Sequence, residues 1–272
     1  MVRALLILVT LSTIAAAETP KERATAILKA QVAALVAGDD QAMIATFTPD
    51  AALEGFMMDE AVPDLHAFDE VALGGSPHNA ITKHKLGPIA AGGNDQVVWY
   101  SADVTLTYSN QHPEERVRNA TRVVRITGLA TAASNWKVVA AMMDNPTKQI
   151  SDATGTAVIR GATTEGPLTK LLASPSALVA ALTPDAVVVG TELRERGIGP
   201  AAKKLVKGWS KLAFSVGGPP REVTTKDYAF TQTAIDWKKG DRLYRFDALA
   251  FALPVDGAWK VVAVHYSTGS PN

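Results

Sequence analysis

The sequence predicts an α+β protein that consists of two copies of one domain in tandem. Trp136–Ala140 (Trp-Lys-Val-Val-Ala) returns as Trp259–Ala263, and Thr48–Ala51 (Thr-Pro-Asp-Ala) returns as Thr183–Ala186, in the same order in each half. The repeats lie much farther apart than the roughly 20 to 50 residues of a solenoid repeat, so they indicate duplicated domains. Each copy shows helical spacing of apolar residues near its start and long alternating segments near its end.

Two helices are predicted at the start of the first copy. Thr19–Glu22 has the pattern of a capping box with proline in the first turn, and Gly38 is a typical end of a helix. A second, short helix, capped by Asp39 or Asp40, runs through Phe47. The first helix has an apolar face that is formed by Ala24, Ile27, Leu28, Val32, Leu35 and Val36.

Strands are predicted for most of the remaining first copy. We expect a strand over Ala51–Met57, a short helix in a variable region at Asn79–Leu86, and a long strand over Gln96–Tyr108, where apolar and polar residues alternate. Arg116–Gly128 and Asn135–Met143 are the last two strands. The three long strands are expected to be antiparallel.

The second copy repeats this order with a shorter start. Pro167–Leu172 stands where the long helix should be, Ser174 and Pro175 begin a short helix, and Gly199 and Pro200 begin another. The inward face of the last helix is predicted to hold Leu205, Val206, Trp209 and Leu212. The three closing strands are expected over Asp227–Trp237, Arg242–Leu253 and Ala258–Tyr266.

Residues 1–17 have the features of a secretory signal peptide. Arg3 supplies positive charge, Ala4–Ile14 an apolar core, and Ala15–Ala17 a small-residue cleavage site before Glu18. The alternative is a membrane anchor, but the apolar stretch is shorter than the roughly 20 residues that span a bilayer. We therefore expect a periplasmic or secreted protein with no membrane association after cleavage. The expected first domain is 18–148, the linker 149–164 and the second domain 165–272.

Composition limits the classes of partner. The chain has 27 Lys plus Arg and 27 Asp plus Glu, so zero net charge gives no electrostatic reason to expect nucleic acid or an anionic membrane. Cysteine is absent, which excludes disulfides and thiolate metal sites. Asn119–Thr121 is a glycosylation sequon that a eukaryotic secretory route could use.

The closing segment Trp259–Ser267 and the order of elements in each copy resemble the SnoaL-like and ketosteroid-isomerase-like domains of the nuclear transport factor 2-like superfamily. The resemblance covers residues 20–145 and about 165–267. It implies two cone-shaped domains, each a curved antiparallel sheet wrapped around N-terminal helices, with a pocket at the open end. Because related cones commonly pair through their sheets, it also implies an internal pseudo-dimer of the two domains. The superfamily includes isomerases, cyclases, dehydratases, transport factors and exported domains of no known activity, so function must be argued from the site.

His265 is the first candidate catalytic residue. Every second residue of the closing strand from Trp259 to His265 is expected to share one face, and the first copy has Met142 where the second has His265. If that face lines the cone, His265 is an imidazole in an apolar pocket that could act as acid, base or hydrogen-bond donor. The alternative is a histidine satisfied by a neighbour in the core or at the rim.

Asp103 and Asp236 are the other candidate catalytic residues. Each could be a general base whose pKa rises through desolvation, and the alternative is a solvated outer face. An alignment of the two strands without gaps places Asp236 opposite Val104, so we expect the acids to point to opposite faces. His265 with Asp236 is the best acid-base pair of the second copy. No tyrosine is marked as a partner of either aspartate, so the ketosteroid isomerase triad is not carried over.

The predicted ligand-pocket residues are Trp136, Met142, Trp259 and Tyr266. No metal and no cofactor are expected, because the five histidines lack the paired spacing of a zinc helix and have no cysteine partners. The glycine pairs are not followed by a phosphate-loop lysine.

The sequence therefore predicts an exported tandem protein that binds a small apolar ligand or supports a protein partner without catalysis, since no matched acid-base set is present. The alternative is an isomerase, cyclase or dehydratase that acts on an apolar substrate in the second-domain pocket. A third possibility is a purely structural assembly in which side chains such as Met143 fill the pockets.

Overall fold

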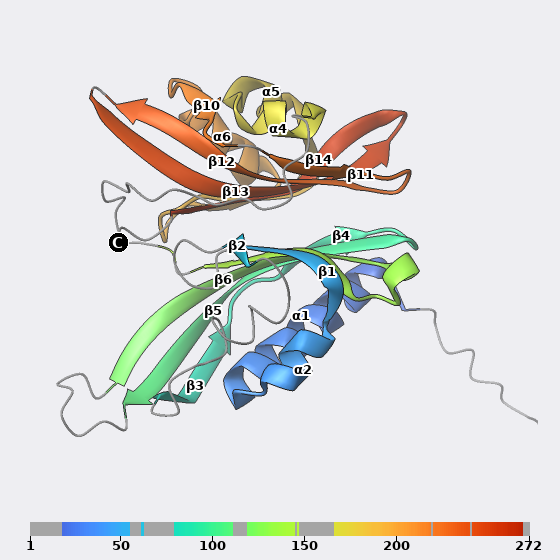
Figure 1. Ribbon diagram of the computed structural model, residues 1–272, viewed down its shortest axis with the longest axis vertical. Helices are drawn as coiled ribbons and strands as arrows, with labels where there is room; N and C mark the ends of the chain where they lie inside the picture. Colours follow the sequence, from blue (N-terminus) through green and yellow to red (C-terminus); the bar gives the residue numbers. More distant parts are fainter. Residues whose placement is uncertain are drawn as a thin grey trace, which may run out of the picture.

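The computed structural model shows an α+β fold with two mixed β-sheets and few helices (Figure 1). The predicted signal peptide and linker lie outside the residues that the structure describes. No helix among the described residues is long and apolar enough to cross a membrane. The described residues are 18–54, 61–62, 79–110, 119–144, 146, 166–218, 220–239 and 241–268.

The helices begin where local sequence signals place them, but the second helix ends at Ala45 and not at the predicted Phe47, which is already in a strand. The described helices are α1 (Pro20–Ala37), α2 (Asp40–Ala45), the short 3-10 helix η2 (Ala132–Ser134), α4 (Pro167–Leu172), α5 (Pro175–Ala181) and α6 (Pro200–Gly208). The predicted capping box is present, because the Thr19 hydroxyl accepts a hydrogen bond from the Glu22 amide and the Glu22 carboxylate accepts one from the Thr19 amide. Gly38 ends α1 at a φ of 64°, where glycine is not penalised, and Asp39 caps α2.

The two sheets have the same strand order. The first is β2-β1-β7-β6-β5-β3, and β4 also pairs with β5. Written from the equivalent edge, the second is β9-β8-β14-β13-β12-β10, and β11 also pairs with β12. The first sheet comprises β1 (Phe47–Glu54), β2 (Ala61–Val62), β3 (Asn79–Leu86), β4 (Ala90–Gly93), β5 (Val97–Asn110), β6 (Asn119–Thr131) and β7 (Val138–Asp144). The second comprises β8 (Leu182–Val189), β9 (Arg196–Ile198), β10 (Phe214–Val216), β11 (Arg221–Thr224), β12 (Ala229–Lys239), β13 (Arg242–Val255) and β14 (Ala258–Thr268).

Both sheets are mixed, so the expectation of wholly antiparallel sheets is wrong at one strand pair in each copy. β1 runs parallel to β7 and β8 runs parallel to β14, whereas the long strands β5, β6 and β7, and β12, β13 and β14, pair as antiparallel neighbours. Parallel neighbours need a long connection. The remainder of each copy lies between these two strands and supplies that connection.

The helix predicted at Asn79–Leu86 is also wrong, because these residues form β3 along one side of β5. Ile81 pairs with Tyr108 and Leu86 with Val104, and the Thr82 hydroxyl donates to the carbonyl of Thr107 at 3.1 Å. The backbone groups that pair with β3 belong to β5, and the residue pattern within 79–86 gives no information about that partner.

The two repeated sequence segments, called marks below, are Thr-Pro-Asp-Ala and Trp-Lys-Val-Val-Ala, and both coincide with register shifts in the sheets. In β1 the shift falls between Phe47 and Ala52, around the Thr-Pro-Asp-Ala mark, and in β8 it falls at the same mark, between Leu182 and Val187. Both strands have the same alternation of buried and exposed residues, with Pro49-Asp50 and Pro184-Asp185 exposed. A bulge accommodates proline because the extra residues are left out of the ladder.

The second mark, Trp-Lys-Val-Val-Ala, also carries a bulge. Ala130 pairs with Val138 but Leu129 pairs with Ala140, so Val139 is the extra residue in β7. Val262 is the extra residue at the same place in β14. An extra residue changes which side chains share a face in the rest of the strand.

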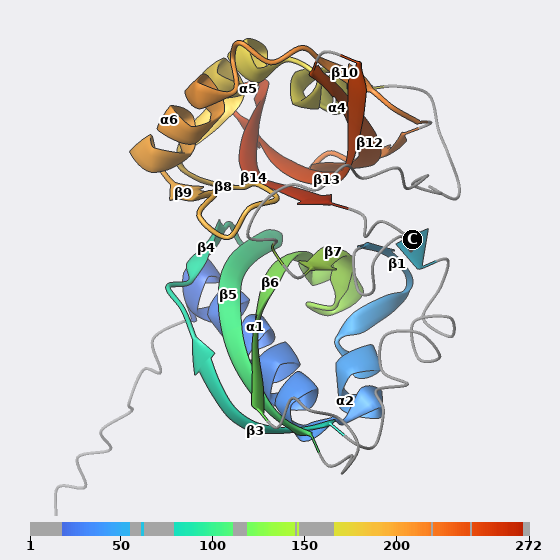
Figure 2. The same cartoon turned by 90° about the vertical axis from the view of Figure 1, so that its left-hand side faces the viewer.

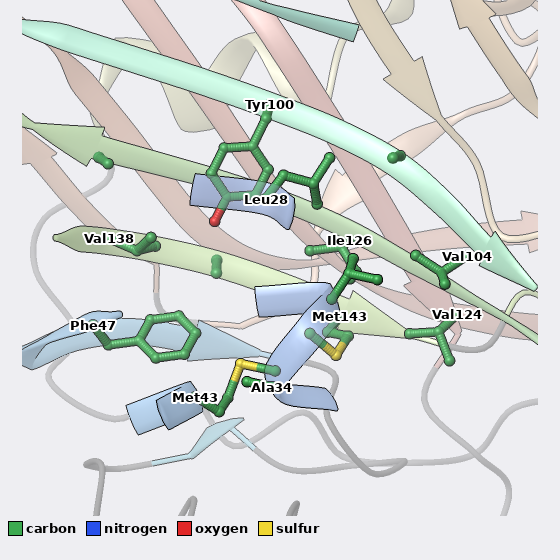
Figure 3. Packing of buried hydrophobic residues seen from close by; sticks show 14 of the residues in the cluster. Leu28, Ala34, Met43, Phe47, Tyr100, Val104, Val124, Ile126, Val138 and Met143 are labelled. Carbon is green, nitrogen blue, oxygen red and sulfur yellow. The ribbon is translucent and has the colours of Figure 1, made fainter. Parts of the chain in front are cut away.

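The first core lies between the first sheet and the helices α1 and α2 (Figure 3). Leu28 and Met143 are among its buried side chains. The Tyr100 hydroxyl donates to the side-chain carbonyl of Gln31 on α1 at 2.6 Å, which ties the helix to the sheet. Tyr100 lies opposite Gly128 of β6, where a Cβ atom would collide with the tyrosine ring and hydroxyl.

The sheets face each other, and the helices lie on their far sides (Figures 1 and 2). The second core lies between its sheet and α4, α5 and α6. A third apolar cluster combines buried residues of both copies, including Trp99, Leu129 and Met142 from the first and Phe230 and Phe251 from the second. The two copies are therefore joined by a packed apolar layer between their sheets.

Gly128→Ala should destabilise the protein by about 1–3 kcal/mol, because a buried, hydrogen-bonded Tyr100 has to move. Urea unfolding monitored by circular dichroism measures the change. The matched control is Gly208→Ala at the end of α6, where nothing lies within 4 Å of the added Cβ atom. That control should be neutral or slightly stabilising, and equal losses in the two variants would contradict the packing argument.

Candidate functional site

A cavity of about 180 Å³ lies at the margin of the second core. Half of its lining residues are aromatic, and the lining comes from the segment that follows α6, from the three long strands and from the loop after β8. The lining residues are Gly190, Thr191, Glu192, Glu195, Trp209, Leu212, Phe214, Trp237, Phe246 and Tyr266.

The aromatic rings hold one another in place. Trp209 meets Tyr266 edge to face with 5.5 Å between ring centroids, and Phe214 lies 6.4 Å from Phe246 and 6.3 Å from Tyr266. Trp237 stacks on Phe246 at 6.4 Å. These separations are those of attractive aromatic pairs, so the cavity wall is fixed by contacts between its own side chains.

Tyr266 contributes its ring to the cavity, while its hydroxyl is engaged elsewhere. The hydroxyl donates to the carbonyl of Leu172 at the end of α4, at 3.3 Å. Burial raises the pKa of Tyr266 well above its ordinary value, so the phenol stays protonated. The ring therefore acts as an apolar wall and the hydroxyl as an anchor for α4.

The loop after β8 supplies the polar edge of the cavity. The Glu195 carboxylate accepts hydrogen bonds from the Trp209 indole at 3.2 Å and from the Glu192 amide at 3.1 Å. Gly190 donates its amide to the Glu195 carbonyl at 2.7 Å, and a Cβ atom on Gly190 would collide with the Glu195 side chain. Glycine at position 190 thus lets Glu195 fold back over the loop.

Arg125 of the first copy holds this loop from the other side. Its buried guanidinium pairs with both carboxylate oxygens of Asp103, at 3.1 and 3.3 Å. It also donates to the carbonyls of Gly190 at 2.7 Å, Glu192 at 3.3 Å and Leu193 at 3.3 Å. The planar, multi-donor guanidinium suits this arrangement, so the first copy supports one wall of the cavity in the second.

Arg196 of β9 continues the same network. It donates to the Ser101 hydroxyl at 3.0 Å, the Ser101 carbonyl at 2.8 Å and Asp103 at 3.2 Å. Burial lowers the pKa of Arg196, and the neighbouring Asp103 carboxylate opposes that effect. The loop is therefore clamped to the first sheet at both of its ends.

His265 does not face the cavity. It lies in the layer between the sheets, where its Nε2 is 2.9 Å from a carboxylate oxygen of Asp144 at the end of β7, and both residues are buried. The expectation that Trp259 and His265 share a face is wrong, because the bulge at Val262 puts Trp259 against the second core and turns His265 to the opposite side.

Asp103 and Asp236 lie on the same kind of face, contrary to the expectation of opposite faces. Both are on the side of the sheet away from the helices, Asp103 in the Arg125 network and Asp236 in an ion pair with Arg245 at 2.6 Å. The ladders align Asp236 with Thr105, one residue away from the Val104 that the alignment without gaps gives, because partner strands and not equal spacing set the register. The structure does not bring Asp236 and His265 together as a pair.

Of the four predicted ligand-pocket residues, the structure places only Tyr266 at the cavity. Tyr266 lines the cavity, and Trp259 packs against the second core. Met142 is buried between the sheets. Trp136 packs against the first core, and the Arg23 guanidinium lies 4.2 Å from its ring centroid.

Most of the cavity lining was not singled out from the sequence. Trp209 was expected to face inward, and the period-two pattern of β12 and β13 could have added Trp237 and Phe246. Glu192 and Glu195 lie in a loop, where spacing carries no information about direction. Within the described residues, no three His, Cys, Asp or Glu side chains are grouped so that they could hold a metal ion.

Glu54 is a buried carboxyl group at the end of β1, in the layer between the sheets. Desolvation raises the pKa of Glu54 well above its ordinary value, the nearby Asp247 carboxylate raises it further, and a hydrogen bond from Gln232 opposes the rise. One Glu54 carboxylate oxygen has no hydrogen-bond partner among the described residues. The folded protein therefore favours the protonated form of Glu54.

No protein-family model matches the chain, and no curated protein sequence matches it. Several solved structures resemble it. A ketosteroid isomerase-like protein from Erwinia carotovora atroseptica is 16% identical, with a TM-score of 0.38, over 46% of this chain and 95% of the other. A putative ketosteroid isomerase from Parabacteroides distasonis is 18% identical, with a TM-score of 0.35, over 42% and 95%.

An NTF2-like protein of unknown function in nutrient uptake from Rhodospirillum rubrum is 14% identical, with a TM-score of 0.35, over 44% of this chain and 96% of the other. Each similarity spans less than half of this chain and nearly all of the other protein. The groups named are those that the Trp259–Ser267 segment resembles. The activities in these names belong to those proteins.

Arg125→Leu should destabilise the protein by about 1–3 kcal/mol, because it takes a donor from three carbonyls of the loop and one of the two arginine partners from Asp103. Chemical unfolding gives the loss. The matched control is Arg245→Leu, which breaks the more exposed pair with Asp236 and should cost about 1 kcal/mol or less. Similar losses in the two variants would show that the Arg125 network does not hold the loop.

Glu54→Gln should stabilise the folded protein near neutral pH by about 1–3 kcal/mol, since the glutamate must take up a proton or bury a negative charge on folding and the neutral amide does neither. Because the folded-state pKa of Glu54 is raised, its contribution to stability is present below its ordinary pKa and is lost as pH rises through the raised value. The difference in unfolding free energy between variant and parent should therefore grow as pH rises. An unchanged difference between pH 5 and pH 8 would contradict the shift.

Proposed function

We propose that the chain is an exported tandem of two SnoaL-like, cone-shaped domains, and that the second domain binds a small organic molecule in its aromatic cavity without converting it. The observation that carries the proposal is the cavity of about 180 Å³ walled by five aromatic side chains. An engineered apolar cavity of roughly 150 Å³ in another protein binds benzene. The size and walls therefore suit a molecule built on a single ring.

We assign the ligand to the second copy because its first helix, α4, is much shorter than the first helix of the first copy, α1. In the first copy α1 has 18 residues, and Leu28 and Val32 fill the core above the sheet. In the second copy α4 has only six residues. The shorter helix covers less of the sheet, which leaves space next to Phe246 and Tyr266.

The chemistry of the lining favours binding over catalysis. Its titratable side chains are Glu192, Glu195 and Tyr266, and the tyrosine hydroxyl already donates to Leu172. The two carboxylates offer bases, and the lining has no Lys, Arg or His that could be the matched acid for general acid-base catalysis. An isomerase, cyclase or dehydratase would have to use Glu195 as its base, and loss of turnover in Glu195→Gln would identify it.

The contacts between the copies support the proposal that the chain is its own pseudo-dimer. The shared apolar layer and the Arg125 network use residues of both halves. Export rests on the signal-like residues 1–17.

Binding is tested on residues 18–272 with benzyl alcohol, a neutral single-ring probe, by calorimetry and thermal unfolding. A ligand that binds only the folded state raises the melting temperature. We expect Phe246→Leu to weaken binding about tenfold or more, because its ring lines the cavity. The matched control is Phe251→Leu on the same strand, which faces the layer between the sheets and should leave affinity unchanged.

Absence of binding by every ring compound tried, charged or neutral, would overturn the proposed function. Equal weakening by Phe246→Leu and Phe251→Leu would place the bound molecule outside this cavity. Export is tested separately, by sequencing the amino terminus of the protein recovered from the cell exterior or periplasm.

A further inference from the structure

The charges at the cavity are all of one sign. Glu192 and Glu195 are in the lining, and no Lys, Arg or His is in it. Within the described residues, the ion pairs of the structure do not involve either glutamate. Arg125 and Arg196 lie on the opposite side of the loop, where they bind Asp103 and main-chain carbonyls. The cavity is therefore negative at its polar edge.

The aromatic walls add to this preference. The faces of Trp, Tyr and Phe rings carry negative charge density and attract a cation within about 6 Å of the ring centroid. Trp209, Phe214 and Tyr266 lie within 5.5 to 6.5 Å of one another, so one group in the cavity can contact several rings. Partial exclusion of water strengthens such contacts.

Glu195 is held as part of the wall. Its two carboxylate oxygens accept hydrogen bonds from the Trp209 indole and the Glu192 amide, which orient the group without neutralising its charge. A neutral ligand would leave this charge without a counter-ion, and an anionic ligand would be repelled. A cationic ligand would pair with it.

From these observations we infer that the ligand of the cavity is a small organic cation, a primary amine or quaternary ammonium attached to a single ring. The inference rests on the proposed function and adds the ligand's charge to it. The ammonium group lies toward Glu192 and Glu195, and the ring lies among Trp209, Phe214 and Phe246.

The test compares three single-ring probes of similar size and different charge: benzyltrimethylammonium, benzyl alcohol and phenylacetate. Calorimetry on residues 18–272 should show that the cation binds about tenfold more tightly than the alcohol, and that the anion binds most weakly. Raising the salt concentration should reduce the differences in affinity between the three probes, because ions screen partly exposed charges.

The glutamates are tested by Glu192→Gln, Glu195→Gln and the double variant, each checked for folding by circular dichroism. The double variant should bind the cation and the alcohol within about threefold of each other. If Glu195→Gln fails to fold, Glu192→Gln alone should still reduce the preference at least about twofold. The control is Asp185→Asn, which removes one exposed negative charge on the β8 bulge and should leave the preference intact.

The outcomes separate the two proposals. Equal or tighter binding of benzyl alcohol, sensitive to Phe246→Leu, would overturn the inference and leave the proposed function standing. A preference for the cation that survives the double variant would also overturn it. Failure of all three probes to bind would overturn both.

Discussion

The bulge in the closing strand of each copy is the constraint on which the rest of the structure depends. One extra residue, Val139 in β7 and Val262 in β14, divides each strand into two parts whose side chains follow different alternations. Before the bulge, Trp259 and Val261 face the second core. After it, Tyr266 faces that core and His265 faces the other copy. The same local irregularity therefore builds a cavity wall and a domain interface from neighbouring residues.

How much the sequence could predict follows from the range of each interaction. The caps of α1 and α2, the long strands and the duplication depend on local pattern, and they were predicted from residues such as Thr19, Gly38 and the repeated Trp-Lys-Val-Val-Ala. The repeated marks were visible as repeats but not as bulges, because a bulge is defined by the partner strand. The face assigned to His265 by simple alternation is consequently wrong. The relative placement of Asp103 and Asp236 is wrong for another reason, since the strand ladders differ by one residue from the alignment without gaps.

The cavity itself depends on something that periodicity does not encode, which is the length of a helix in relation to the sheet that it covers. The short start of the second copy was recognised from Pro167–Leu172, but its consequence appears only when α4 is set against the sheet that α1 covers in the first copy. The loop that completes the site is held by Arg125, which is far away in the sequence and belongs to the other domain.

Covalent fusion explains how the two copies came to differ at equivalent positions. In a symmetric dimer one residue serves both halves of the interface, so any change appears twice. Here the ladders align Arg125 of β6 with Asp247 of β13. Arg125 binds the loop after β8 through three carbonyls, whereas Asp247 lies near Glu54 at the end of β1 and raises its pKa. One half of the interface is thus an attractive clamp beside the cavity, and the other half brings two carboxyl groups together. A symmetric homodimer could not hold this asymmetry, and in this chain it lets the first copy support a loop that lines the cavity of the second.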